Sequence, residues 1–147
     1  KADAFDTSMT TDWISLANYG RITFFVHTGN ATSDTANGTI TLLASASSTG
    51  SSTTALAFKY RVCASSTSVD TWGALTDATS SGFSMTAGDN YLYEVEILAD
   101  EVEAQAAGKK FVALKVTESS NDPIVGAVLG ILSEPRYPQS VPLTAIS

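Results

Sequence analysis

The sequence predicts an all-β protein: a single-domain β-sandwich or jelly-roll-like barrel of about eight antiparallel strands, with extended N- and C-terminal arms. Its composition is the first indication, because only 16% of the 147 residues are charged while Ser and Thr contribute 19 residues each. Thr, Val, Ile and aromatic residues favour strands, and Ser, Gly, Asn and Asp supply turns. The second indication is a period of two between apolar and polar residues in several stretches, without the strand–helix rhythm of a parallel sheet.

The N-terminal third predicts an arm followed by three strands. Residues 1–12 have no periodicity and predict a mobile arm, and residues 13–16 predict a short strand. Residues 21–28 alternate regularly, and Asn37-Gly38 is a tight-turn signal that leads into residues 39–46, the expected antiparallel partner. The core-facing residues expected in the first long strand are Ile22, Phe24 and Val26.

The middle of the chain predicts one clear strand and one short one. Residues 55–64 alternate most regularly, and residues 83–86 predict a short edge strand. Between them, residues 65–81 form a long connection in which Trp72 is expected to hold the segment against the core. The core-facing residues expected in the regular strand are Leu56, Phe58, Tyr60 and Val62.

Two further strands flank a short predicted helix. Residues 91–98 and 111–118 both alternate. Between them, Asp100 and Glu103 have capping-box spacing, and Gly108 stands where a helix would end. The sequence therefore predicts one or two helical turns that connect two strands.

The most apolar run is Pro123–Pro138, PIVGAVLGILSEPRYP. Residues 124–132 predict a buried core strand, in which Gly126 and Gly130 mark a bulge or a close backbone approach. Three prolines follow, so the remaining residues are expected to cross a surface in extended form. The predicted organisation is an arm (residues 1–12), a β-sandwich domain (13–133) and a Pro-rich arm (134–147).

Composition and spacing argue against several functions. A net charge of -7 with eight Lys and Arg gives no basic surface for nucleic acid, and no apolar run approaches the ~20 residues of a membrane helix. The single histidine, His27, has no partners for a zinc site or a catalytic triad. Glu94 and Glu96 share a strand face about 7 Å apart, as in some glycosidases, but a solvated face opposite Lys59 and Arg61 is favoured. We expect no enzyme activity, cofactor, metal, nucleic-acid or membrane partner.

One alternative uses three aromatic residues. Trp13, Trp72 and Tyr137 would form a sugar-stacking platform in a carbohydrate-binding or adhesin module. Single aromatic residues near strand ends more often cover a core or anchor an interface, so this interpretation ranks second.

Four phrases of the sequence carry a resemblance to a known family. They are NYGRITFFVHTG, ALAFKYRV, DTWGA and, most specifically, VGAVLGILSEPRYPQSVPLTAI. Together they run from about Asn18 to Ile146 and resemble small head decoration, or cement, proteins of tailed bacteriophages. The resemblance implies a compact β-fold, homotrimers at three-fold and quasi-three-fold positions of the capsid, and reinforcement of the shell against internal DNA pressure. It implies no catalytic residues.

On this interpretation the partners are the major capsid protein and the chain itself, on the outer capsid surface of the virion, with assembly in the host cytoplasm. Another virion component, such as a head fibre or tail protein, is a further alternative. The residues expected at the interfaces are Phe5, Trp13, Trp72, Arg136, Tyr137 and Pro138.

Overall fold

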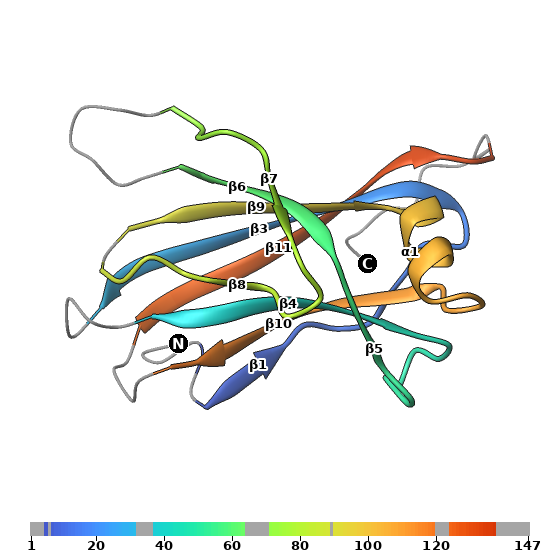
Figure 1. Ribbon diagram of the computed structural model, residues 1–147, viewed down its shortest axis with the longest axis horizontal. Coiled ribbons are helices and arrows are strands. Elements are labelled where there is room, and N and C mark those ends of the chain that lie inside the picture. The colour runs from blue at the N-terminus through green and yellow to red at the C-terminus, as the bar shows by residue number, and fades with distance from the viewer. Residues whose placement is uncertain are drawn as a thin grey trace, which may run out of the picture.

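Two antiparallel sheets packed face to face form the protein, which we describe from a computed structural model (Figure 1). The described residues are 5, 7–31, 37–63, 71–88, 90–119 and 124–137. Within these ranges there are eleven strands and one helix. Their bounds are β1 Ser8–Thr10, β2 Ile14–Ser15, β3 Tyr19–Ala31, β4 Gly38–Ser45, β5 Thr54–Leu56, β6 Phe58–Cys63, β7 Thr76–Ala78, β8 Phe83–Ser84, β9 Leu92–Leu98, α1 Ala99–Gln105, β10 Phe111–Glu118 and β11 Ile124–Pro135.

Sheet A has the order β1-β10-β4-β5, with β2 beside β1 on β10 and β8 beside β5 on β4. Sheet B has the order β11-β3-β9-β6-β7. No pairing among the described strands joins the two sheets, so the predicted all-β sandwich is confirmed as an open sandwich rather than a closed barrel.

The core lies between the inner faces of the two sheets. Alternate residues of the four central strands point inward, as the period of two predicts, and each is at most 1% exposed. From sheet A these residues are Ile40, Leu42, Ala44, Val112, Leu114 and Val116, and from sheet B they are Ile22, Phe24, Val26, Tyr93, Val95 and Ile97.

The expected hairpin between residues 21–28 and 39–46 is wrong. These residues lie in β3 and β4, which belong to different sheets. β3 pairs instead with β9 and β11, and β4 pairs with β10. Each of these strands has one apolar face. That face is buried equally well whether the strands pair side by side in a hairpin or face each other across the core of a sandwich.

The predicted strand of residues 55–64 divides into two strands in different sheets. β5 pairs with β4 in sheet A, and β6 pairs with β9 in sheet B. The chain crosses between the sheets at Ala57, where the Gln105 side chain of α1 accepts a hydrogen bond from the Ala57 N–H (2.7 Å) and donates one to its carbonyl (3.0 Å). Because Leu56 and Phe58 both remain buried, the alternation in the sequence does not reveal the crossing.

The helix forms where it is expected, with a different cap. The Leu98 N–H at its start donates to the Glu101 carboxylate at 3.0 Å. The Glu103 carboxylate accepts instead from the Gly108 N–H at 3.1 Å, after the helix has ended. Gly108 has φ +76°, a left-handed conformation that favours glycine. The expected pairing of Asp100 with Glu103 is therefore replaced by two local contacts.

The N-terminal segment differs from the expected mobile arm. β1 pairs with β10 in sheet A, with Met9 opposite Val116. Further along, the Thr11 N–H donates to the Leu114 carbonyl at 2.9 Å, and the Leu114 N–H donates to the Thr11 hydroxyl at 3.1 Å. Phe5 is only 2% exposed and belongs to the core. Three residues of strand are too few to give a periodicity that the sequence could reveal.

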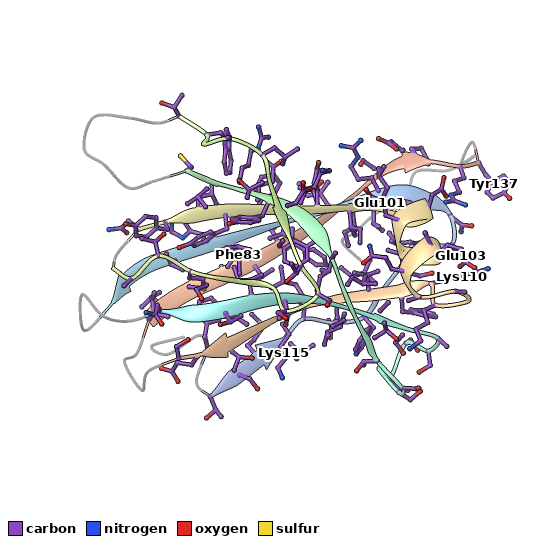
Figure 2. All side chains as sticks on the ribbon, viewed as in Figure 1. Phe83, Glu101, Glu103, Lys110, Lys115 and Tyr137 are labelled. Carbon is purple, nitrogen blue, oxygen red and sulfur yellow. The ribbon has the colours of Figure 1, made fainter. Side chains whose placement is uncertain are left out.

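Aromatic rings close the side of the sandwich formed by β6 and β8. Phe83 of sheet A stacks on Tyr60 of sheet B with 3.7 Å between ring centroids and 6° between ring planes. Phe58 and Tyr93 approach the same Phe83 ring at 6.1 Å and 5.8 Å. Phe83 (labelled in Figure 2) therefore connects sheet A to three aromatic rings of sheet B.

The stability of the domain should fall at alkaline pH because of Tyr93. Burial raises the pKa of its phenol to about 12, against a partly opposing effect of its hydrogen bonds with the Thr86 backbone. An unfolded tyrosine titrates at about pH 10, so the unfolded chain binds fewer protons across this window and the free energy of unfolding decreases as pH rises through it.

We expect Tyr93→Phe to be less stable than the parent by about 1 kcal/mol at neutral pH, because it lacks those hydrogen bonds. Between about pH 10 and about pH 12 the unfolded parent loses the phenol proton that the folded parent keeps, which costs the parent roughly 1.4 kcal/mol of stability for each pH unit between the two pKa values. The difference should therefore shrink as pH rises through this window and reverse in sign near its upper end. Urea unfolding of both proteins across this range measures the effect. A constant difference at every pH would contradict it.

Candidate functional site

The predicted buried strand is an exposed edge strand. β11 pairs with β3, and alternate β11 side chains point outward on the outer face of sheet B. Val125 is 46% exposed, Leu129 60% and Ile131 45%. The buried core strand predicted from the continuous apolar run is therefore wrong for the outward-facing residues. Only Ile124 of this strand is fully buried, while Val128 and Leu132 pack partly against the core.

β11 is the terminal strand of sheet B among the described strands, and the edge that it forms is unusual in length and composition. Within the described residues, the other edge strands are two or three residues long, whereas β11 has twelve. The β7 edge carries Asp77, paired with Lys59 at 2.6 Å, which is the kind of charge that protects an edge. Ile124–Leu132 contains no charged residue or proline, and Pro123 and Glu134-Pro135 lie on either side of it.

The inner side of β11 lies against the N-terminal segment. A Cβ atom added to Gly126 would be 2.7 Å from the Phe5 ring, and one added to Gly130 would be 3.0 Å from Ile14 Cδ1. These contacts confirm the predicted close approach at the two glycines. The pairing with β3 also shifts register between Ile124 and Gly126, so that three steps along β3 match two along β11.

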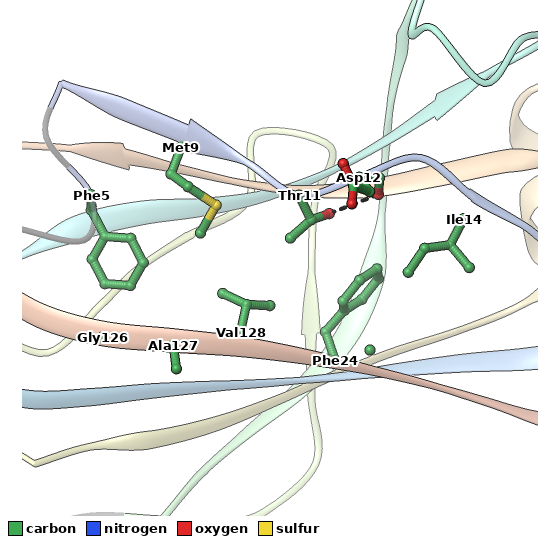
Figure 3. A pocket seen from close by; sticks show the side chains of 10 residues that line it. Phe5, Met9, Thr11, Asp12, Ile14, Phe24, Gly126, Ala127 and Val128 are labelled. Atoms are coloured by element: carbon green, nitrogen blue, oxygen red, sulfur yellow. Dashed lines mark hydrogen bonds between the residues drawn. The ribbon is translucent and has the colours of Figure 1, made fainter. Parts of the chain in front are cut away.

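A groove with a volume of about 430 Å³ runs between this N-terminal segment and β11. Met9, Thr11 and Ile14 lie along one side, and Gly126, Ala127 and Val128 of β11 lie along the other (Figure 3). The open side of the sandwich is therefore partly apolar and lies directly beside the free edge of β11.

Ion pairs cover the outer face of sheet B next to this edge. Arg61 contacts Glu94 at 2.8 Å, and Arg21 contacts both Glu96 (3.2 Å) and Glu134 (3.0 Å). Glu94 is only 7% exposed, so this strand face is less solvated than the sequence suggested. Glu94 and Glu96 thus each form an ion pair with an arginine. This arrangement gives an ordinary structural explanation for the pair that had resembled glycosidase carboxylates.

Trp72 lies on this same outer face rather than against the core, where it was expected. The Arg61 guanidinium is 4.8 Å from the centre of its ring, and the Phe25 ring is 6.3 Å away. A single β-bridge to Cys63 fixes the backbone of Trp72. A half-exposed aromatic residue next to an arginine is well suited to contact a partner.

The other predicted interface residues lie in separate places. Trp13 packs against Gly50, and Arg136 pairs with Asp100 at 2.8 Å. Tyr137 is 66% exposed and projects beyond the end of the sandwich (Figure 2). Phe5 is buried in its own chain, and Pro138 lies outside the described residues.

The proposed aromatic platform of Trp13, Trp72 and Tyr137 is not assembled. Trp72 forms a β-bridge with Cys63, and the strand pairings place Cys63 at the same level across sheet B as Ala127, in the first half of β11. Tyr137, in contrast, follows the C-terminal end of β11. From Ala127 to Pro135 alone the strand spans roughly 25 Å.

His27 is exposed on β3, opposite Ala127 and Leu92. In the part of the chain that the structure describes, no three His, Cys, Asp or Glu residues gather as metal ligands. The same part has no helix that is long and apolar enough to span a membrane.

The chain matches no family model, no curated protein and no solved structure. The similarity of its C-terminal block to phage decoration proteins therefore remains a prediction from the sequence.

The contact between Gly126 and Phe5 should be measurable as a coupling energy between substitutions at these two positions. We expect Gly126→Ala to destabilise the protein by about 1–3 kcal/mol, because the added methyl group overlaps the Phe5 ring. Combined with Phe5→Leu, the loss should be smaller than the sum of the two single losses by at least about 0.5 kcal/mol.

Gly29→Ala is the matched control, because its added Cβ would meet Val125 at an ordinary 3.6 Å. Urea unfolding of the single and double variants provides all the values. Strict additivity at Gly126 and Phe5, or an equal loss at Gly29, would contradict the proposed packing.

Proposed function

We propose that this protein is a structural component of a phage virion: a decoration protein that binds the outer surface of the icosahedral capsid as a homotrimer and stabilises it. The observation that carries the proposal concerns the C-terminal block, which holds the most specific resemblance. In the fold that block is β11, an exposed apolar edge strand that leads into the Pro-rich end of the chain.

An exposed strand edge suits assembly for a physical reason. The outer edge of β11 pairs with no other described strand, so its backbone groups can bind a strand of a partner, and the main-chain hydrogen bonds then provide affinity. The neighbouring Val125, Leu129 and Ile131 add apolar area that association would remove from water. A protein that binds only the assembled shell stabilises that shell by mass action, and the stabilisation from many bound copies adds up.

The chain after β11 remains bound to the sandwich as far as Arg136. The Arg136 N–H donates to the Asn18 carbonyl at 2.9 Å, and its side chain pairs with Asp100. The last described residue, Tyr137, is strongly exposed. We infer that residues 138–147 contact the shell or a sister subunit.

Co-sedimentation tests the proposal, with shells assembled from the major capsid protein encoded by the same genome. We expect the protein to bind assembled shells, to leave unassembled capsid subunits unbound, and to raise the temperature at which the shells come apart. Deletion of residues 138–147 should weaken shell binding at least tenfold and leave the melting temperature of the free protein nearly unchanged.

Arg136→Ala is a useful comparison, since it removes one surface ion pair but keeps the chain length. Failure of the full-length protein to bind shells, with binding to purified tails or fibres instead, would replace the decoration role by another virion role. Equal loss of shell binding and of stability on deletion would place the segment in the core of the fold.

The carbohydrate-binding alternative rests on one observation, the half-exposed Trp72 beside Arg61. Next to these residues, Phe25 and Ile131 help to line a shallow depression of about 530 Å³ on the outer face of sheet B. A glycan array decides between the two functions. If the alternative holds, the parent should bind a defined glycan and Trp72→Ala should lose that binding, whereas Leu75→Ala, at another exposed apolar residue, should retain it.

A further inference from the structure

We propose that β11 pairs with β11 of a second copy of this chain, antiparallel and about a two-fold axis through Val128. This pairing would join two copies of sheet B into one continuous sheet. It does not rest on capsid binding, and it is distinct from the three-fold contact that the resemblance implies.

The first argument is that the strand is self-complementary. An antiparallel pair centred on Val128 places each residue opposite the one at the mirror position, so Ile124 meets Leu132 and Val125 meets Ile131. Ala127 then meets Leu129, and Val128 meets itself. All nine residues from Ile124 to Leu132 find an apolar or glycine partner, with no charged residue in the set.

The second argument is that the register is selective. A two-fold axis perpendicular to the sheet keeps the outward-facing residues of both copies on the same face. Because residues directly opposite each other in an antiparallel pair also point to one face, the axis must lie at the level of a residue and not between two residues. Moving it to Ala127 places Asp122 opposite Leu132, and moving it to Leu129 places Glu134 opposite Ile124. Only the axis at Val128 pairs the whole apolar run with itself.

The third argument comes from the inner side of the strand. The register places Gly126 opposite Gly130 of the second copy, the two positions where a side chain would overlap the N-terminal segment. Phe5 covers the first glycine and Ile14 the second. The two-fold axis would therefore bring Phe5 of one copy near Ile14 of the other, and the grooves on the two open sides would face each other.

The fourth argument is the composition of this edge. Natural edge strands are usually short, charged or interrupted by proline, because an open apolar edge recruits other strands. The described edges of β1, β2, β5, β7 and β8 are short. β11 is long, and its proline and acidic residues lie only at the ends of the apolar run, where they would stop the pairing at nine residues.

Native mass spectrometry and sedimentation of the full-length protein give the first test. Two-fold pairing predicts a dimer, or a hexamer if trimers also form. A monomer or a trimer would overturn the pairing. A dimer would support the pairing but contradict the trimer proposed above, so the two proposals fail independently.

Charge substitutions then test the register. In the proposed pair, position 127 of each copy faces position 129 of the other on the solvent side. The double variant Ala127→Lys/Leu129→Lys should halve the native mass, because four like charges meet at the axis. The double variant Ala127→Glu/Leu129→Glu should do the same.

An equimolar mixture of the two double variants should restore the parent mass as a mixed assembly, because opposite charges now face each other. Leu75→Lys is the control, at a residue that is 51% exposed but lies away from β11, and it should keep the parent mass. Circular dichroism checks that each variant is folded. Unchanged mass in both double variants, or no mixed assembly from two folded monomers, would overturn the proposal.

Discussion

The packing of the N-terminal segment onto β11 is the contact on which the arrangement of this molecule most depends. Phe5 packs onto β11 where residue 126 has no side chain to overlap its ring, and Ile14 packs closely where residue 130 has none. The contact joins the two ends of the chain and holds one side of the sandwich together. It also covers the inner face of β11, whose outer edge pairs with no other described strand.

The two sides of the sandwich are therefore different. On the side of β6 and β8, the stack of Phe83 on Tyr60 joins the sheets with large aromatic rings. On the side of β11, small residues leave a groove, and the exposed side chains are aliphatic. The β11 side therefore combines exposed apolar area with a strand edge that has no pairing partner among the described strands. Association through this open side is the common basis of both proposals.

The sequence predicts the core of this fold well and its connections poorly. Alternation identifies the inward residues of β3 and β9, because one face of each is buried and the other carries polar or charged groups. It cannot show that β3 and β4 lie in different sheets, or that Ala57 marks a crossing, since a buried face looks the same in either topology.

The candidate site is hidden for a related reason. Nine consecutive apolar residues contain no alternation, so the sequence alone does not separate a doubly buried strand from an exposed edge. Gly126 and Gly130 are the informative residues, since glycines within a strand often mark a bulge or a close approach. The sequence predicts Trp72 against the core, because nothing in the sequence shows that its neighbours are Arg61 and Phe25 on the outer face.

Hydrogen exchange along β11 is the most direct test of the claim that its outer edge is open in the single chain and paired in the assembly. Roughly half of the amides in residues 124–132 point away from β3 in an antiparallel ladder. We expect these amides to exchange quickly in dilute protein and to become protected as concentration rises, while those bonded to β3 stay protected throughout. Exchange that does not change with concentration would contradict the account.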